Sequence, residues 1–123
     1  MSQNPIYRNV LIVDDDPVIR DMMVDILEFE GFSITTVRNG QEALARMREE
    51  GHHLVFLDLM MPVMTGSEVC QALEAEPEVR RRHVIILMSA MDHLEEATSL
   101  NADALMPKPF SVDDVLAAIA PYI

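Results

Sequence analysis

Short runs of apolar residues alternate along the chain with longer segments in which apolar residues recur every three or four positions. The runs occupy residues 10–13, 32–37, 54–57, 84–88 and, more weakly, 104–106. Runs that are apolar at successive positions are typical of strands buried on both faces of a parallel sheet. The pattern therefore predicts five parallel strands.

The segments between the runs predict five helices, because their apolar residues fall on one helical face. These residues are Ile19, Met22, Met23 and Ile26; Ala43, Leu44 and Met47; Val69, Ala72 and Leu73; Leu94 and Ala97; and Val112, Val115, Leu116 and Ile119. Asp16 before Pro17 is the N-cap expected for the first helix. Four further starts are predicted where a capping residue has an acid three positions later, at Asn39, Thr65, Asp92 and Ser111. Helix ends are predicted at Gly31, Gly51 and Pro77.

Five strands alternating with five helices predict a doubly wound α/β domain, a parallel sheet covered by helices on both faces. No repeat, linker or low-complexity segment divides the chain, so we expect one domain over residues 1–123 with a tail at residues 1–8. In such folds, ligands bind beyond the carboxyl ends of the strands. The residues that follow the strands are therefore the candidate site.

The composition narrows the choice of partners. The chain has 21 acidic and 9 basic residues among 123, a net charge of −12, which disfavours direct contact with nucleic acid or an anionic membrane. Proteins, metal ions and basic surfaces are the expected partners. Cys70 is the only cysteine, and the sequence shows neither a signal peptide nor a transmembrane run, so we expect a cytoplasmic protein without disulfides.

Acidic residues gather where the first and third strands end. Asp14 and Asp15 follow the first strand and Asp58 ends the third, while Ser89 ends the fourth and Lys108 follows the fifth. If the first and third strands are neighbours, the carboxylates meet in one crevice, where two charges about 5 Å apart repel by roughly 3 kcal/mol at an effective dielectric of about 20. Such a group must take up a proton or hold a cation, and oxygen ligands favour Mg²⁺ or Mn²⁺.

The other residues with metal or redox chemistry are predicted to form no site. The four histidines, His52, His53, His83 and His93, lack metal-ligand spacing and are expected at the surface. Cys70 lies within the third predicted helix, where a small buried or half-buried residue is expected rather than a reactive thiol.

Four motifs together give the chain a specific resemblance. They are Val-Asp-Asp-Asp-Pro at residues 13–17, Leu-Asp-Leu-Met-Met-Pro-Val-Met-Thr-Gly at residues 57–66, Leu-Met-Ser-Ala at residues 87–90 and Lys-Pro-Phe at residues 108–110. In this order and spacing the chain resembles the CheY-like receiver domains of response regulators, from bacterial two-component systems, over residues 9–123. The resemblance implies the flavodoxin-like strand order 2-1-3-4-5, a property of that family.

The resemblance implies that Asp58 is the phosphoacceptor, taking a phosphoryl group from a histidine kinase, a phosphotransfer protein or a small phosphodonor. Lys108 would supply positive charge to the phosphoryl oxygens and Ser89 a hydroxyl donor. The chemistry fits, because a carboxylate that attacks an anionic phosphoryl group needs charge neutralisation and positioning above all. The chain would then be a signalling phosphoacceptor that catalyses its own phosphorylation and slow dephosphorylation.

The resemblance also assigns the ligands of a Mg²⁺ or Mn²⁺ ion. Asp15 and Asp58 would bind the ion directly, together with the backbone carbonyl of Met60, and Asp14 would act mostly through water. The family further has a cis peptide bond at the lysine–proline step, which is Lys108–Pro109 here.

Three positions are expected to affect lifetime and switching. Met60 and Met91 lie two residues past Asp58 and Ser89, where the family flanks the path of the hydrolytic water, and both are apolar here. Leu105 stands where receivers commonly carry a tyrosine or phenylalanine that turns inward on phosphorylation. Leu105 is either a weaker switch residue or part of an apolar docking patch. That patch would lie on the face of the fourth helix, fifth strand and fifth helix. The resemblance implies that this face binds output partners, and a phosphorylation-dependent dimer is one possible partner arrangement.

Two alternatives stay open. A small phosphatase of the haloacid-dehalogenase type would use Asp14 as its nucleophile, since Asp14 and Asp16 after a strand and Asp113-Asp114 later imitate that family's motifs. Against it, Asp113 and Asp114 fit the first turn of a helix, where acids favour the macrodipole, and Asp58 would have no role. A pseudo-receiver that binds partners without phosphorylation is disfavoured because all five site residues are present.

Overall fold

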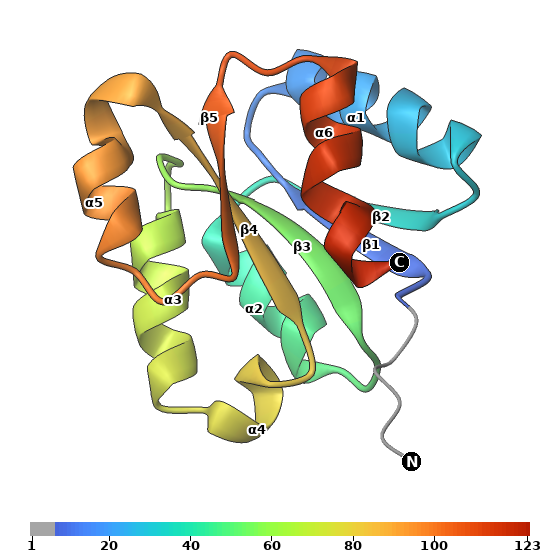
Figure 1. Cartoon of the computed structure of the whole chain (residues 1–123). Coiled ribbons are helices and arrows are strands. Elements are labelled where there is room, and N and C mark those ends of the chain that lie inside the picture. Colours follow the sequence, from blue (N-terminus) through green and yellow to red (C-terminus); the bar gives the residue numbers. More distant parts are fainter. Residues whose placement is uncertain (1–6) are drawn as a thin grey trace.

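The structure, a computed structural model, describes residues 7–123 and has a five-stranded parallel sheet at its centre (Figure 1). The strands are β1 Asn9–Val13, β2 Ser33–Val37, β3 His53–Asp58, β4 Val84–Ala90 and β5 Ala104–Lys108. Their order is β2-β1-β3-β4-β5, and every neighbouring pair is parallel. The predicted fold class and strand order are confirmed. The predicted tail at residues 1–8 lies mostly outside the described residues.

Helices cover both faces of the sheet. They are α1 Pro17–Phe29, α2 Gly40–Arg48, α3 Gly66–Glu74, α4 Pro77–Arg80, α5 Leu94–Thr98 and α6 Val112–Ile119, with short 3-10 turns η1 Met91–His93 and η2 Ala120–Tyr122. Figure 1 shows α1 and α6 on one face and α2, α3 and α5 on the other. Within residues 7–123, no helix has both the length and the apolar character needed to cross a bilayer.

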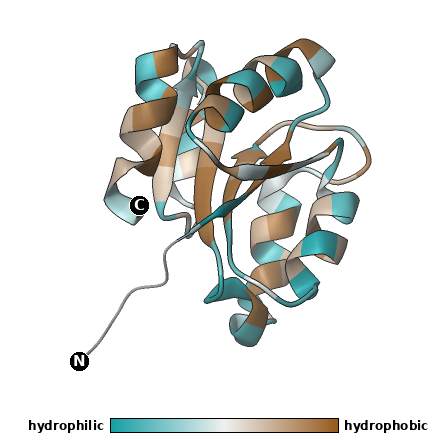
Figure 2. Cartoon of the chain, turned by 90° about the vertical axis from the view of Figure 1, so that its right-hand side faces the viewer, coloured by the Kyte–Doolittle hydropathy of each residue, from teal (hydrophilic) through white to brown (hydrophobic). Residues whose placement is uncertain are grey.

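The core has two halves because successive strand residues point to opposite faces of the sheet. Leu11 and Val13 of β1 pack into the half under α2, α3 and α5. Val10 and Ile12 pack into the half under α1 and α6. Figure 2 shows the central strands coloured as hydrophobic between the two helical layers. Burial of both faces explains why the strand sequences are apolar at every position.

Side-chain caps start most of the helices where the sequence predicts them. Asp16 accepts from the Val18 N–H, and Asn39 accepts from the Glu42 N–H. Thr65 and Ser111 form full capping boxes with the acids three residues later. The cap predicted at Asp92 is wrong, because Asp92 lies inside the turn η1 and α5 begins after His93 without a side-chain cap.

Two further sequence predictions need correction. The chain forms six helices rather than five among the described residues, because Pro77 both follows α3 and starts the one-turn helix α4. Proline suits the first turn of a helix, where its missing N–H is not needed. His83 is buried rather than at the surface, since its Nε2 bonds the Met47 carbonyl and its Nδ1 accepts from the His53 N–H. These two bonds replace the water that the ring loses on burial.

Candidate functional site

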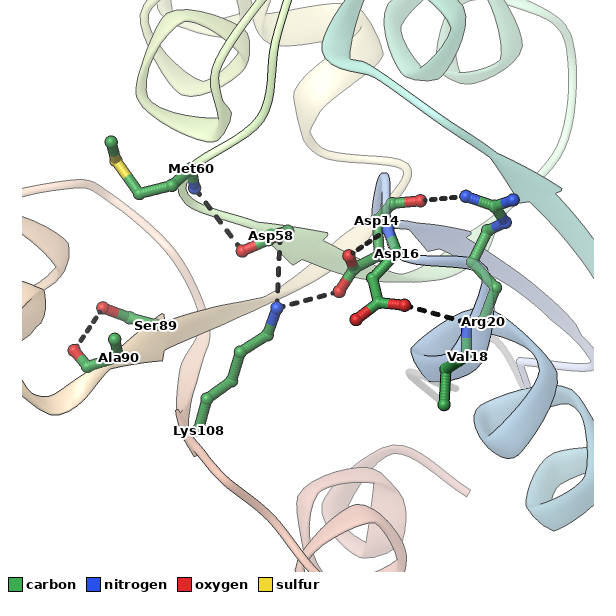
Figure 3. Close-up of polar contacts among 9 residues, drawn as sticks. All are labelled: Asp14, Asp16, Val18, Arg20, Asp58, Met60, Ser89, Ala90 and Lys108. Atoms are coloured by element: carbon green, nitrogen blue, oxygen red, sulfur yellow. Dashed lines mark hydrogen bonds and ion pairs between the residues drawn. The ribbon is translucent and has the colours of Figure 1, made fainter.

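The ends of β1 and β3 place two buried carboxylates side by side. Val13 of β1 pairs with Leu57 of β3, so Asp14 and Asp58 continue two adjacent strands at the same edge of the sheet. Lys108, at the end of β5, reaches across to both of them (Figure 3). Its Nζ lies 2.9 Å from Asp14 Oδ2 and 3.2 Å from Asp58 Oδ2. The structure therefore brings together three of the site residues predicted from the sequence.

Asp15 completes an acidic cluster at this edge. One carboxylate oxygen from each of Asp14, Asp15 and Asp58 lies within 4.8 Å of the others, and Asp15 is the exposed member. Hard oxygen donors at this separation are the ligand set that Mg²⁺ and Mn²⁺ take in proteins. The donor set thus fits a divalent ion that is reached from solvent past Asp15.

Burial and mutual charge govern the protonation of the cluster. Burial, followed by the charge of Asp14, raises the pKa of Asp58 to about 6, against the opposing effect of the Lys108 ammonium. Burial alone would lower the pKa of Lys108, but its hydrogen bond to Asp14 and the charge of Asp58 outweigh burial and raise that pKa. At neutral pH the lysine is therefore charged and most Asp58 is carboxylate.

The raised pKa of Asp58 predicts a pH-dependent gain in stability for Asp58→Asn without a metal ion. The folded state holds the Asp58 proton more tightly than the unfolded state, so ionised Asp58 costs stability as pH rises from 3.8 through about 6. Above that range we expect the variant to be more stable than the wild type by about 1–3 kcal/mol. The free energies of unfolding of the two proteins are measured by urea titration in chelator, and their difference should vanish near pH 4. A difference that does not change with pH would contradict the raised pKa of Asp58.

The loop after β3 is held close to Asp58 by a glycine. A Cβ on Gly66 would overlap the Asp58 carbonyl oxygen and lie 2.9 Å from the Leu59 Cα, so any other residue would push the loop away from the strand end. The Gly66 N–H donates to the Leu59 carbonyl, and the Met60 N–H points at Asp58 Oδ1 from 3.4 Å. Val63 in this loop has φ +69°, an uncommon conformation for a β-branched residue. The loop backbone is thus fixed around the Asp58 carboxylate.

The other predicted site residues lie around this cluster without joining it. Ser89 is buried, but its hydroxyl donates to the Ala90 carbonyl at 3.0 Å, and no bond to Asp58 or Lys108 occurs in the described part of the chain (Figure 3). The Met60 and Met91 side chains are exposed. Predicted roles for these residues stay predictions.

Two residues near Lys108 bear on the switch and the peptide geometry. Lys108–Pro109 is a cis peptide bond, as the resemblance implied. Leu105 is exposed on β5 and lines a surface groove together with Pro109.

Sequence reasoning missed a further contact to the cluster. Arg20 of α1 donates from Nη1 to the backbone carbonyl of Asp14 at 2.7 Å (Figure 3). Asp14 also accepts the Asp16 N–H on Oδ1 at 2.9 Å. Both bonds hold the turn after β1 in place. The available signal was an arginine one turn into a helix that starts beside the acidic turn, but sequence spacing does not show which carbonyl it reaches.

Comparison with known proteins agrees with this geometry. A family model described as the response regulator receiver domain matches residues 10–120. The chain is 34% identical over 114 residues to the DNA-binding response regulator MtrA of Mycolicibacterium smegmatis, covering 91% of this chain and 49% of MtrA. It is 36% identical over 114 residues to the sensory transduction protein RegX3 of the same species, covering 90% and 48%. The chain thus spans about half the length of these curated relatives.

Solved structures show the same fold. The chemotaxis response regulator CheY4 of Vibrio cholerae superposes with a TM-score of 0.83 at 27% identity, covering 95% of this chain and 99% of that one. The response regulator TrrA of Thermotoga maritima, in complex with Mg²⁺ and BeF, superposes with a TM-score of 0.82 at 30% identity, covering 94% and 99%.

Proposed function

Because the chain belongs to the family of response regulator receiver domains, we propose that it accepts a phosphoryl group on Asp58 in a reaction that depends on Mg²⁺ or Mn²⁺. The donor would be the phosphohistidine of a histidine kinase or phosphotransfer protein. The observation that carries the proposal is the contact of one ammonium, Lys108, with the buried carboxylates Asp14 and Asp58 at the end of the sheet. That residues 1–123 form a single receiver domain is part of the same proposal.

The arrangement supports an attack by Asp58 on phosphorus. An Asp58 oxygen forms the new P–O bond while the P–N bond to the donor histidine breaks, and the bonding pair returns to the imidazole nitrogen. Lys108 then exchanges its carboxylate contacts for phosphoryl oxygens, where its charge offsets the charge of the transferring group. Ser89 reaches the phosphoryl group only if its hydroxyl leaves the Ala90 carbonyl.

A divalent ion would be held by Asp15 and Asp58 with the Met60 carbonyl, and through water by Asp14. When bound it supplies positive charge that neutralises the carboxylates and the phosphoryl oxygens. Without that charge, three acidic groups within 4.8 Å repel the incoming anion.

The test is phosphorylation by a small phosphodonor such as phosphoramidate, followed by intact mass spectrometry. We expect a mass gain of one phosphoryl group per chain with Mg²⁺, and labelling roughly a hundredfold slower in chelator. Urea-denatured protein serves as the control for unspecific reaction. Equal labelling with and without metal ion would refute the proposal, and no labelling at all would favour a pseudo-receiver.

We predict a long-lived phosphoryl group on the wild type. Thioethers at Met60 and Met91, two residues past Asp58 and Ser89, do not orient a water molecule, and both side chains are exposed. The double variant Met60→Asn/Met91→Glu is expected to lose the label faster, by roughly tenfold, because its polar groups orient the attacking water. Decay of labelled protein after donor removal measures the rate; equal or slower decay in the variant would contradict the prediction.

The proposed output is a change in partner binding at the face formed by α5, β5 and α6, which we call the output face. It is the predicted face of the fourth helix, fifth strand and fifth helix, renumbered because α4 is an additional turn. MtrA is a DNA-binding protein by name, whereas the charge of −12 on this chain argues against direct contact with nucleic acid. The phosphatase alternative is not favoured, because Asp14 is fully buried with both carboxylate oxygens bonded.

A further inference from the structure

The output face carries an apolar groove at the free edge of the sheet. Among the described residues β5 pairs only with β4, so its other edge has no strand partner there, and Figure 1 shows β5 flanked by α5 and α6. Leu105, Pro107 and Pro109 from β5 and the following turn line a groove of about 350 Å³ together with Ala117 and Ala118 of α6. Leu105 and Pro107 are exposed to solvent.

The segment that contains α5, β5 and α6 carries almost only negative charge, and its Asp114 lines the groove. From Met91 to Ile123 the sequence holds six carboxylates and a single lysine or arginine, Lys108. The six carboxylates all lie on exposed residues: Asp92, Glu95, Glu96, Asp103, Asp113 and Asp114. Lys108 points away from this face, because its ammonium bonds Asp14 and Asp58.

Few of these carboxylates are compensated. Asp103 pairs with Arg80 of α4, and Glu96 accepts a hydrogen bond from the Ser67 hydroxyl of α3 and lies 3.9 Å from a nitrogen of His93, so these two carboxylates are engaged by other elements. Within residues 7–123, no ion pair involves Asp92, Glu95 or Asp113. Asp114 uses one oxygen to accept the Ser111 N–H and lines the groove. The groove therefore combines an apolar floor with Asp114 at its edge, and the elements beside it carry Asp92, Glu95 and Asp113 without an ion pair.

This charge pattern bears on which partner fits. In a two-fold dimer the same patch meets itself, so Asp114 and the unpaired acids near it would approach their own copies without a lysine or arginine of this face to pair with. An extended strand added to β5 is also disfavoured, because Pro107 has no N–H to give to it. A helix that lays apolar side chains in the groove and places lysine or arginine near Asp114 and the unpaired acids satisfies both features.

We propose that the output face binds a basic amphipathic helix of a different protein, and not a second copy of this chain. The proposal rests on the proposed function only in taking this face as the output surface. The family resemblance leaves open a dimer formed through this face, and the proposal argues against that dimer. The reason is that no lysine or arginine between Met91 and Ile123 is exposed.

The test uses a fluorescein-labelled helical peptide with a leucine stripe flanked by lysines, and a counterpart with glutamate in place of lysine. Binding to the full chain is measured by anisotropy, with and without Mg²⁺ and beryllofluoride as the phosphoryl mimic. We expect the lysine peptide to bind and the glutamate peptide not to bind. Leu105→Ala should weaken binding by about tenfold and Asp114→Asn by about threefold. Asp114→Asn keeps an oxygen for the helix cap.

Asp25→Asn, on the exposed side of α1, is the matched control for the overall charge of −12. Asp25→Asn should leave binding of the lysine peptide unchanged. Sedimentation should show that the wild type is a monomer both with and without Mg²⁺ and beryllofluoride. Failure of the lysine peptide to bind, equal weakening by Asp25→Asn, or a dimer that Leu105→Ala disperses would each overturn the proposal. Failure of the proposed function shows separately, as a missing mass gain with phosphodonor, because peptide binding is also measured on unmodified protein.

Discussion

Asp58→Asn is expected to abolish phosphoryl labelling, with a loss in rate of at least a hundredfold or so. The asparagine keeps the size of the side chain and an oxygen that accepts from the Met60 N–H, which lies 3.4 Å away. It lacks the negative oxygen that forms the bond to phosphorus. Intact mass after treatment with phosphoramidate and Mg²⁺ measures the loss, and the stability of the variant without metal ion shows that the protein is folded.

Asp14→Asn is the matched control, because it removes the same charge from the same cluster. Its Oδ2 is the other acceptor of the Lys108 ammonium, at 2.9 Å. We expect slower labelling of this variant but a phosphoryl group that still forms on Asp58, as peptide mapping would show. Labelled Asp58→Asn together with unlabelled Asp14→Asn would reverse the assignment and make Asp14 the nucleophile, as in the phosphatase alternative.

The sequence was sufficient for the features that depend on periodicity and strand ends. Continuous apolar runs predicted parallel strands, and the strand ends predicted that Asp14, Asp58 and Lys108 converge. The order of the strands came from the family resemblance, because apolar runs carry no information on which strand lies beside which. Once β1 and β3 are neighbours, the meeting of the carboxylates follows from the geometry of a parallel sheet.

Features that depend on single side-chain directions could not be predicted. The Ser89 hydroxyl bonds the Ala90 carbonyl, and Arg20 bonds the Asp14 carbonyl, although neither choice is encoded in spacing. Burial of His83 depends on the Met47 carbonyl, 36 residues away in the chain, as the partner of its ring. A polar residue is buried when such a partner exists, and only the folded structure supplies it.

Short helices mark the other limit of sequence reasoning. The one-turn helix α4 has too few residues for an apolar period, and a proline read as a helix end starts it. Asp92 has the spacing of a capping residue but lies inside a 3-10 turn. Pro77 is compatible with the end of one helix or the start of the next, and Asp92 with a cap or a turn. The structure formed by the neighbouring residues decides between these possibilities.

Lys108→Gln is expected to separate metal binding from phosphoryl transfer. The lysine ammonium competes with a divalent ion for the oxygens of Asp14 and Asp58, so its removal should tighten Mg²⁺ binding by roughly tenfold. The same change removes the positive charge available to the phosphoryl oxygens, so labelling at saturating Mg²⁺ should slow by roughly a hundredfold. Calorimetry suits the binding measurement, because the chain contains no tryptophan to report it.

The opposite signs of these two effects distinguish an electrostatic role of Lys108 from a structural one. A lysine that only held the strand ends together would, when replaced, loosen the carboxylates and weaken both metal binding and labelling. Arg38→Gln removes the same charge from an exposed ion pair with Glu42 and should change neither.

Lys108 is also the only lysine in the chain, so selective isotope labelling of lysine gives a single side-chain NMR signal. That signal should shift when Mg²⁺ binds and again when Asp58 is phosphorylated, because the ammonium exchanges carboxylate partners for phosphoryl oxygens; a signal indifferent to phosphorylation would contradict the role assigned to Lys108.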